Sequence, residues 1–166
     1  VKTIFYTDGK NMRRAEAVGN AEFVSTPHQA SVSNYRTAVN APRFDCDFFE
    51  TGNRLKECVA YTETKTIRTP TVQREGRGEQ TITADRLNTS FGEGSGNIEK
   101  INAAGKAKFI ELDKNALANT FSFTDSDEVV RLRGGDPTAW DSKARVKAKE
   151  IDWDTRNQKS FLRNGV

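Results

Sequence analysis

A short apolar frame that recurs along the chain is the feature that most constrains its fold. The segment AKEIDWDT, at 148–155, contains the frame as a small residue followed three and five positions later by apolar residues. Repetition of one pattern predicts that one supersecondary unit is used several times. The five copies are Val1, Ile4, Tyr6; Ala41, Phe44, Cys46; Ala84, Leu87, Thr89; Ala118, Phe121, Phe123; and Ala148, Ile151, Trp153.

A turn cluster follows every copy of the frame and predicts a β-hairpin there. Gly, Asn and Asp are concentrated in these clusters, and they tolerate the positive φ of tight hairpin turns. Stretches with period-two alternation come next, most clearly at 15–23 and 101–109, which match position for position and predict strands. The clusters are TDGKN at 7–11, ETGN at 50–53, GEGSGN at 92–97, TDSDE at 124–128 and DTRNQ at 154–158.

The spacing inside the frame predicts bent strands. Residues two apart in a strand share a face, whereas residues three apart do not, so the step from Ala148 to Ile151 requires a bulge or a bend. We therefore expect an all-β chain of consecutive antiparallel hairpins whose bent strands wrap around one apolar interior, as a folded sheet or a closed sandwich. No stretch combines helical apolar spacing with caps, so no helix is predicted.

Superposing the copies predicts which residues face one another across each hairpin. In the second hairpin, whose turn surrounds Gly52, the rule places Cys46 opposite Cys58. A close, non-hydrogen-bonded pair would allow a disulfide, whereas two free thiols would serve as small apolar residues, and both alternatives stay open. The other expected pairs are Tyr6 with Ala15, Thr89 with Ile101, Phe123 with Leu132, and Trp153 with Phe161.

The composition requires the apolar residues to be concentrated on one surface. Of the 166 residues, 35% are hydrophobic and 30% are charged, and the mean hydropathy is −0.73. No window approaches the roughly 18–20 apolar residues of a membrane span, so no transmembrane segment is expected. The net charge of +3 comes from 26 basic and 23 acidic residues that are interspersed. This pattern predicts a solvated surface and no nucleic-acid partner.

The residues with catalytic or metal-binding chemistry form no recognisable site. The only histidine, His28, stands in the loop-like segment STPHQAS, and no motif supplies it with a catalytic partner. Carboxylates such as Asp45 and Asp152 alternate with apolar residues, which predicts an outward sheet face rather than a converging acid pair. GEGSGN lacks the lysine and the following helix of a phosphate loop, and two cysteines are too few for zinc. We therefore predict no enzyme, no cofactor and no metal.

Several segments of the chain resemble the OstA-like repeats of the periplasmic lipopolysaccharide-transport proteins, the family that includes LptA, LptC and the N-terminal domain of LptD. The segments are ITADRL, IEKINAAGKAKF, AWDSKARVKAKEIDWDT and KSFLRNGV. The resemblance is strong from about residue 79 to the end and weaker over 1–61. It implies a β-jellyroll shaped like a folded taco shell, which agrees with the bent hairpins. It also implies that the acyl chains of lipopolysaccharide are held in an apolar crease while the lipid crosses the periplasm.

On this resemblance, residues 1–166 are expected to form a single OstA-like domain of the periplasm, as a piece of a longer chain. Its expected partners are lipopolysaccharide or a similar lipid, and other OstA-like domains joined edge to edge. Small inward residues such as Ala103 and Ala107 favour an interior that side chains do not fill completely. The residues expected to line the lipid groove are Ile4, Tyr6, Phe23, Phe44, Phe48, Leu87, Ile101, Phe109, Phe121, Phe123, Leu132, Ile151, Trp153 and Phe161.

The two ends of the hairpin run are expected to be sheet edges. Unpaired N–H and C=O groups on a terminal strand can template pairing with another chain. We expect head-to-tail association, with 160–166 of one copy beside 1–7 of the next. Such a contact does not need to close, so dimers and filaments are both compatible with it.

Two other functions stay open at the level of the sequence. A structural or adhesive β-solenoid segment would have a sealed core and no lipid ligand, and an open apolar groove would distinguish lipid carriage from it. A polysaccharide-binding jellyroll would need exposed aromatic residues, for which Tyr35 and Tyr61 are the candidates. Basic residues near the rim would meet lipid phosphates or form a solvated face. They are Arg131, Arg133, Lys143, Arg145 and Lys147.

Overall fold

The computed structural model describes residues 1–28, 34–73, 75–157 and 159–163, and all regular structure in these ranges is β-strand. The all-β prediction is therefore confirmed. None of the described residues belongs to a helix long and apolar enough to span a membrane. The strands are β1 (Lys2–Phe5), β2 (Met12–Ser25), β3 (Tyr35–Phe48), β4 (Leu55–Pro70), β5 (Gln80–Phe91), β6 (Ile98–Glu111), β7 (Lys114–Thr124), β8 (Val129–Arg133), β9 (Thr138–Trp140), β10 (Arg145–Lys147), β11 (Glu150–Asp154) and β12 (Lys159–Arg163).

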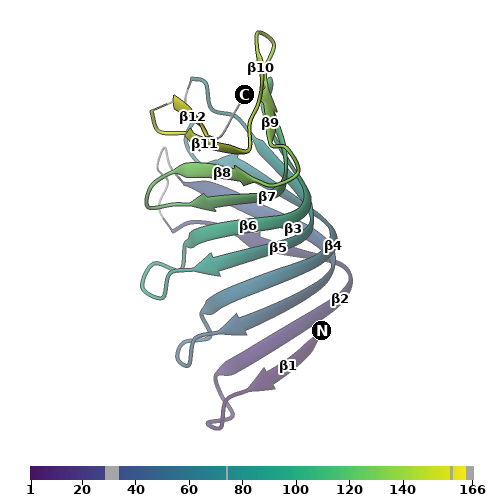
Figure 1. Ribbon diagram of the computed structural model, residues 1–166. Coiled ribbons are helices and arrows are strands. Elements are labelled where there is room, and N and C mark those ends of the chain that lie inside the picture. The colour runs from purple at the N-terminus through teal and green to yellow at the C-terminus, as the bar shows by residue number, and fades with distance from the viewer. Residues whose placement is uncertain (29–33, 74, 158, 164–166) are drawn as a thin grey trace.

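The strands pair antiparallel in nearly the order in which the chain forms them. The main path runs from β1 to β8 in sequence order and continues to β11 and β12, while β9 pairs with β7 and β10 pairs with β9. In Figure 1 the chain accordingly climbs from β1 at the bottom to β11 and β12 at the top. The sheet stays unclosed, because β1 and β12 each pair with one neighbour among the described strands.

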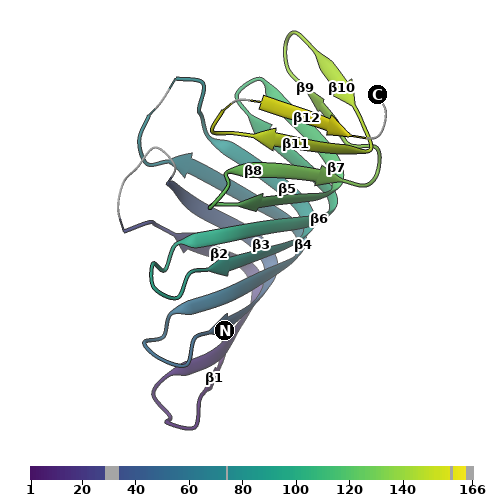
Figure 2. The same cartoon turned by 60° about the vertical axis from the view of Figure 1, so that its left-hand side comes forward.

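The long strands fold this sheet over on itself, as Figures 1 and 2 show. A register irregularity interrupts the pairing near the middle of these strands, which bend there. We call the two halves layer A and layer B. Layer A contains β1, residues 12–18, 43–48, 55–61, 86–91, 98–104 and 120–124, β8, β11 and β12; layer B contains residues 21–25, 35–41, 64–70, 80–84, 107–111 and 114–118, β9 and β10.

The bends explain the three-residue step inside the frame. The steps from Ala41 to Phe44 and from Ala84 to Leu87 both cross a register shift, and all four side chains are buried in one interior. The extra residues at each shift restore the inward direction of the following side chain. The expected taco of bent hairpins is thus confirmed.

Gly105 allows β6 to bend beside β5. Gly105 has a φ of 82°, which a residue with a Cβ adopts only with strain. A Cβ added at this position would also collide with the carboxylate of Asp85 on the neighbouring strand. In the segment INAAGKAKF the glycine therefore stands where β5 and β6 bend side by side.

Side chains from the two layers meet in one apolar core. Phe109 of layer B stacks on Phe121 of layer A with ring centroids 5.6 Å apart, and it meets the ring of Trp153 edge-on at 5.7 Å. Nearer the N-terminal end, Phe23 of layer B meets Phe91 of layer A edge-on, also at 5.7 Å. The middle of the interior is therefore packed rather than hollow. Other members of the core include Val39, Ala60, Ile82, Ala103, Ala107 and Val130.

The structure has two of the predicted strand pairs. Thr89 faces Ile101, and Cys46 faces Cys58. The Cα atoms of the two cysteines are 4.1 Å apart and their sulfurs form a disulfide, which excludes the free-thiol alternative. A separation this short is typical of a close, non-hydrogen-bonded pair in an antiparallel ladder.

Two pairs predicted for the C-terminal hairpins are wrong. Phe123 faces Val130 instead of Leu132, a displacement of two residues that leaves every side chain on its expected face. Trp153 faces Ser160 instead of Phe161. This second displacement is by one residue, and it moves Phe161 to the opposite face of the sheet.

Candidate functional site

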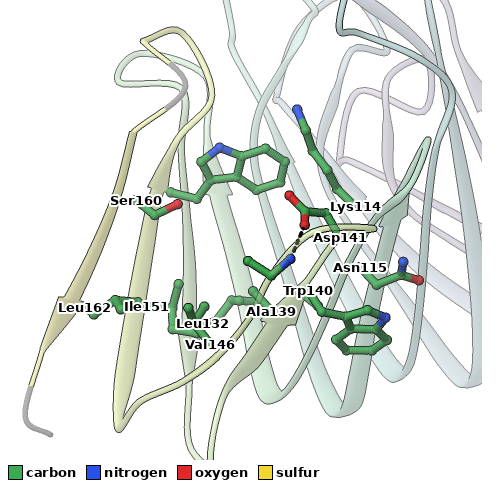
Figure 3. A pocket seen from close by; sticks show the side chains of 13 residues that line it. Lys114, Asn115, Leu132, Ala139, Trp140, Asp141, Val146, Ile151, Ser160 and Leu162 are labelled. Atoms are coloured by element: carbon green, nitrogen blue, oxygen red, sulfur yellow. Dashed lines mark hydrogen bonds between the residues drawn. The ribbon is translucent and has the colours of Figure 1, made fainter. Parts of the chain in front are cut away.

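A cavity of about 320 Å³ lies between the layers at the C-terminal end of the interior. Leu132 and Ile151 line it and also belong to the apolar core, so the cavity continues the core. Figure 3 shows these two side chains close to Ala139 and Val146. The complete lining consists of Lys114, Asn115, Ala116, Leu132, Ala139, Trp140, Asp141, Ala144, Val146, Ile151, Trp153, Ser160 and Leu162.

Three short strands build the cavity around the ends of the layers. On layer B, β9 places Ala139 opposite Ala116 of β7, and β10 places Val146 opposite Ala139. On layer A, β12 places Leu162 opposite Ile151. The side of the cavity at β12 is open, because Leu162 is 38% exposed.

Two charged residues, Lys114 and Asp141, belong to a lining that is otherwise mostly apolar. The Nζ atom of Lys114 lies over the ring of Trp153, 5.1 Å from its centroid, in a cation–π contact. Asp141 accepts hydrogen bonds of 2.8 Å from the backbone N–H groups of Lys143 and Ala144, one of which is drawn in Figure 3. These backbone hydrogen bonds hold the pKa of Asp141 below its usual value. The carboxylate therefore fixes the β9–β10 turn.

Most of the residues expected to line a groove lie inside the fold. Of these, Leu132, Ile151 and Trp153 line the cavity. Phe48 is buried, and its carbonyl oxygen accepts a hydrogen bond of 3.0 Å from the hydroxyl of Tyr6. The remainder lie in the packed core or against it, so their contact with a ligand stays a prediction; they are Phe23, Phe44, Leu87, Ile101, Phe109, Phe121 and Phe123.

The placement of the first hairpin corrects two predictions. Ala15 faces Thr3 rather than Tyr6, because the turn places Tyr6 opposite Asn11, whose carbonyl oxygen accepts a hydrogen bond of 2.8 Å from the Tyr6 N–H. The same register puts Ile4 opposite Arg14, on the outer face of layer A, where Ile4 is 39% exposed. Ile4 therefore does not line the interior.

Phe161 is also wrong as a lining residue. It faces Asp152, whose neighbour Ile151 points inward, so alternation directs Phe161 outward. Its exposed fraction is 53%. The adjacent Leu162 takes the inward position and lines the cavity.

A polar cluster, which the sequence did not predict, closes the interior at the strand ends away from the bends. The guanidinium of Arg68 lies between two rings, 4.4 Å from the centroid of Tyr35 and 4.7 Å from that of Phe123. Its Nη1 donates a hydrogen bond of 2.8 Å to Oε1 of Gln80, whose Nε2 donates one of 3.1 Å to Oε1 of Glu111. Arg68 joins the layers, because Tyr35 belongs to layer B and Phe123 to layer A.

Burial governs the charges in this cluster. Desolvation lowers the pKa of Arg68 to about 10, which leaves it protonated at neutral pH. Desolvation raises the pKa of Asp125, and the positive charge of Arg68 opposes that rise. The one signal for the cluster in the sequence is the alternation of the polar residues Thr64, Thr66 and Arg68 within one strand. The structure places all three side chains on the inward face, where they are buried.

The basic residues expected at the rim fall into two groups. Arg131 and Arg133 alternate with the inward Val130 and Leu132, so both lie on the outer face and not at the rim. Lys143, Arg145 and Lys147 belong to the β9–β10 hairpin beside the cavity, and their contact with lipid phosphates stays a prediction. The observed contacts are Arg131 with Asp127, Arg133 with Asp152, Lys147 with Asp136, and Arg145 over the ring of Trp140.

The other candidate residues form no site for chemistry or for sugars. His28 is exposed, and the described ranges contain no group of three or more His, Cys, Asp or Glu side chains that could hold a metal ion. Tyr35 is buried in the polar cluster, so the prediction of an exposed aromatic platform is wrong for it. Tyr61 lies between the guanidinium groups of Arg43 and Arg86, whose Cζ atoms are 5.6 and 5.4 Å from its ring centroid.

Comparison with known families decides where this architecture belongs. The model of the LptA/(LptD N-terminal domain) LPS transport protein family matches residues 71–159, which is more than half of the chain. The chain belongs to this family. The match starts in the loop before β5 and extends to β12, so it contains most of the cavity lining.

The fold of this LptA-family chain is also found among solved structures. The crystal structure of LptH, described as the LptA homologous periplasmic component of the conserved lipopolysaccharide transport device from Pseudomonas aeruginosa, aligns with a TM-score of 0.58. The alignment has 14% sequence identity and covers 78% of this chain and 82% of LptH. It confirms the expected jellyroll. No curated protein sequence matches the chain.

Proposed function

We propose that this chain is a periplasmic component of lipopolysaccharide transport that binds acyl chains of the lipid between its layers and passes the lipid toward the outer membrane. Family membership supports the substrate, and the description of LptH as a periplasmic component supports the compartment. The open cavity beside β12 carries the proposal, because it offers apolar surface continuous with the core. Binding of this kind uses no catalytic residue and no cofactor.

The size of the cavity limits how much lipid it takes in the observed conformation. Its volume of about 320 Å³ is about ten times the ~30 Å³ that one water molecule occupies in the liquid. A methylene group is of similar size, so one acyl segment of about ten methylenes fills the cavity. At about 0.8 kcal/mol per methylene, this burial contributes up to ~8 kcal/mol, equivalent to a micromolar Kd before ordering is subtracted.

A structural β-solenoid with a sealed core is the second candidate function. The packed middle of the interior favours it, since Phe109 and Phe121 fill the space between the layers there. Family membership and the open end at Leu162 favour lipid binding. The two candidates differ in whether the cavity lining contacts lipid.

Site-specific photo-crosslinking tests this contact. A benzophenone amino acid at Leu162, which lines the cavity, is expected to capture purified lipopolysaccharide. The same group at Phe161 is the matched control, because it sits one residue away on the outer face of the same strand. The adduct is measured on a denaturing gel with an antibody against the lipid.

The expected result is a lipid adduct at Leu162 and little or none at Phe161. A second inward position, Trp153, should also crosslink. Equal labelling at the inner and outer positions would indicate nonspecific adsorption. Absence of labelling at both inward positions would favour the sealed scaffold.

The two edges of the sheet support edge-to-edge partners of the same family. β1 pairs only with β2, and β12 only with β11, among the described strands. Each therefore presents a row of backbone groups to which a further strand can add. Residues 164–166, which also belong to the predicted docking segment, lie outside the described part of the chain.

Substitution of Phe161 with proline is expected to weaken self-association, because proline lacks the backbone N–H and disfavours ladder pairing. Light scattering over a range of protein concentrations measures the effect: the mass of the unmodified chain should rise with concentration, and that of the variant should rise less. Phe161→Ala is the control for the loss of the ring. A monomeric mass for the unmodified chain at every concentration would contradict self-association through these edges.

A further inference from the structure

A lipid with several acyl chains is larger than the cavity, so its entry requires the two layers to separate. The need for this separation rests on the proposed function. Along the bends the layers are joined by continuous strands and do not come apart there. Separation must therefore begin on the opposite side, where Arg77, between β4 and β5 of layer B, meets the turns of layer A.

Arg77 makes contacts across this opening, next to the cluster of Arg68, which also joins the layers. Its side chain is 8% exposed. Nη2 donates hydrogen bonds to Oε2 of Glu128 at 3.2 Å and to the carbonyl oxygen of Thr155 at 3.1 Å, and Nη1 donates one to the hydroxyl of Tyr35 at 3.2 Å. Glu128 and Thr155 belong to two turns of layer A, whereas Tyr35 belongs to layer B. One guanidinium thus ties two turns of one layer to the other layer.

Glu128 joins the two turns of layer A to each other. Its second carboxylate oxygen, Oε1, accepts a hydrogen bond of 3.2 Å from Nη2 of Arg156. Its backbone carbonyl oxygen accepts two more from Thr155, at 3.0 Å from the N–H group and at 2.8 Å from the hydroxyl. The two turns are therefore expected to move as one unit when their hydrogen bonds to Arg77 break.

The same turns are attached to the cavity wall. Glu128 directly precedes β8, which supplies Leu132, and Thr155 directly follows β11, which supplies Ile151 and Trp153. Displacement of the two turns away from Arg77 would carry these strands outward. The cavity would then widen on the side that faces layer B.

We propose that Arg77, Glu128 and Thr155 form a latch that keeps the layers closed and opens to admit the acyl chains of lipopolysaccharide. An ion pair suits a reversible contact, because water hydrates both charged groups favourably when they separate. Separation of an apolar contact would instead expose apolar surface to water, which is unfavourable. A closed latch protects the apolar interior while no lipid is bound. An open latch leaves Arg77 and Arg156 at the entrance, where guanidinium groups bind phosphate groups of the lipid.

The test compares how fast the closed and the weakened latch admit lipid. Glu128→Gln keeps the size of the side chain and removes its charge, so purified lipopolysaccharide is expected to associate and dissociate about tenfold faster. Sodium dodecanoate, a single-chain probe that fits the cavity without separation of the layers, should bind at an unchanged rate. Stopped-flow fluorescence of Trp153 in a Trp140→Phe background measures both rates.

Two controls separate the latch from other effects. Asp127→Asn removes a neighbouring carboxylate on the same turn, which pairs with Arg131 outside the latch, and it should leave both rates unchanged. Arg77→Lys retains the charge but loses the forked donor, so it should accelerate association less than Glu128→Gln does. Urea unfolding of each variant verifies that the compared proteins are folded.

The outcomes distinguish the latch from the function on which it rests. Failure of the unmodified protein to bind either probe would contradict the proposed function. Binding of lipopolysaccharide at the same rate by the unmodified protein, Glu128→Gln and Arg77→Lys would overturn the latch and leave the function intact. Acceleration by Asp127→Asn equal to that by Glu128→Gln would also overturn it, because the effect would then follow surface charge.

Discussion

Replacement of Phe109 with alanine is expected to lower the free energy of unfolding by about 3–5 kcal/mol. The side chain is 2% exposed and contacts Phe121 and Trp153 of the opposite layer. Truncation therefore removes buried surface and leaves a void between two layers whose strands are held at the bends and cannot collapse freely. Urea unfolding followed by circular dichroism measures the change from the transition midpoint.

The control for Phe109→Ala is Phe161→Ala. Phe161 is the same residue type, but its side chain is 53% exposed on the outer face of β12, so its loss should change the free energy of unfolding by less than about 0.5 kcal/mol. Similar losses from the two substitutions would contradict the assignment of Phe109 to the joint between the layers. A large loss from Phe161→Ala alone would contradict the register of β12.

Reduction of the disulfide between Cys46 and Cys58 is expected to lower the free energy of unfolding by about 3 kcal/mol. The two residues are separated by 12 positions, and a closed loop of this length restricts the unfolded chain by about that amount. The folded state should survive, because the pair lies within continuous ladders on both sides. Thermal unfolding with and without a reductant measures the difference.

The double variant Cys46→Ala/Cys58→Ala shows whether the reductant acts through this bond. Its unfolding midpoint should not respond to the reductant. It should lie near that of the reduced protein, lowered further by the lost sulfur atoms. Equal midpoints for the oxidised and the reduced protein would show that the crosslink does not restrict the unfolded chain.

The sequence predicts the fold well because two independent periodicities agree. The frame specifies where strands bend, and the turn clusters specify where they reverse. Together they limit the register of hairpins whose strands have a single apolar face, such as the one that pairs Thr89 with Ile101. The disulfide pairing follows from the same rule, since the strands on either side of the turn around Gly52 place the two cysteines directly opposite each other.

Register fails where neighbouring residues are equally apolar. In β12 both Phe161 and Leu162 are apolar, so alternation alone does not decide which one points inward. A shift of one residue exchanges the faces, so the larger side chain is exposed. In β8 the error has no effect on the faces, because Val130 and Leu132 are both inward and a shift of two keeps the alternation.

The cavity and the latch depend on contacts that periodicity does not encode. Trp140, Val146 and Leu162 come together only because β9 and β10 leave the main path of the sheet. Arg77 lies in a segment without repeat character, and its partner Glu128 follows 51 positions later. Pairing of this kind is determined by how the layers close, and a single sequence carries little signal for it.

The nearly sequential order of the strands has a consequence for how the molecule forms. From β2 to β7 each strand pairs with the strands immediately before and after it, so each new ladder closes only a short loop, whose entropy is small. Structure can therefore grow hairpin by hairpin, as in repeat proteins. A chain that emerges N-terminus first would have its early strands folded before the later ones arrive. Up to β8, the last strand to fold would be the template for the next.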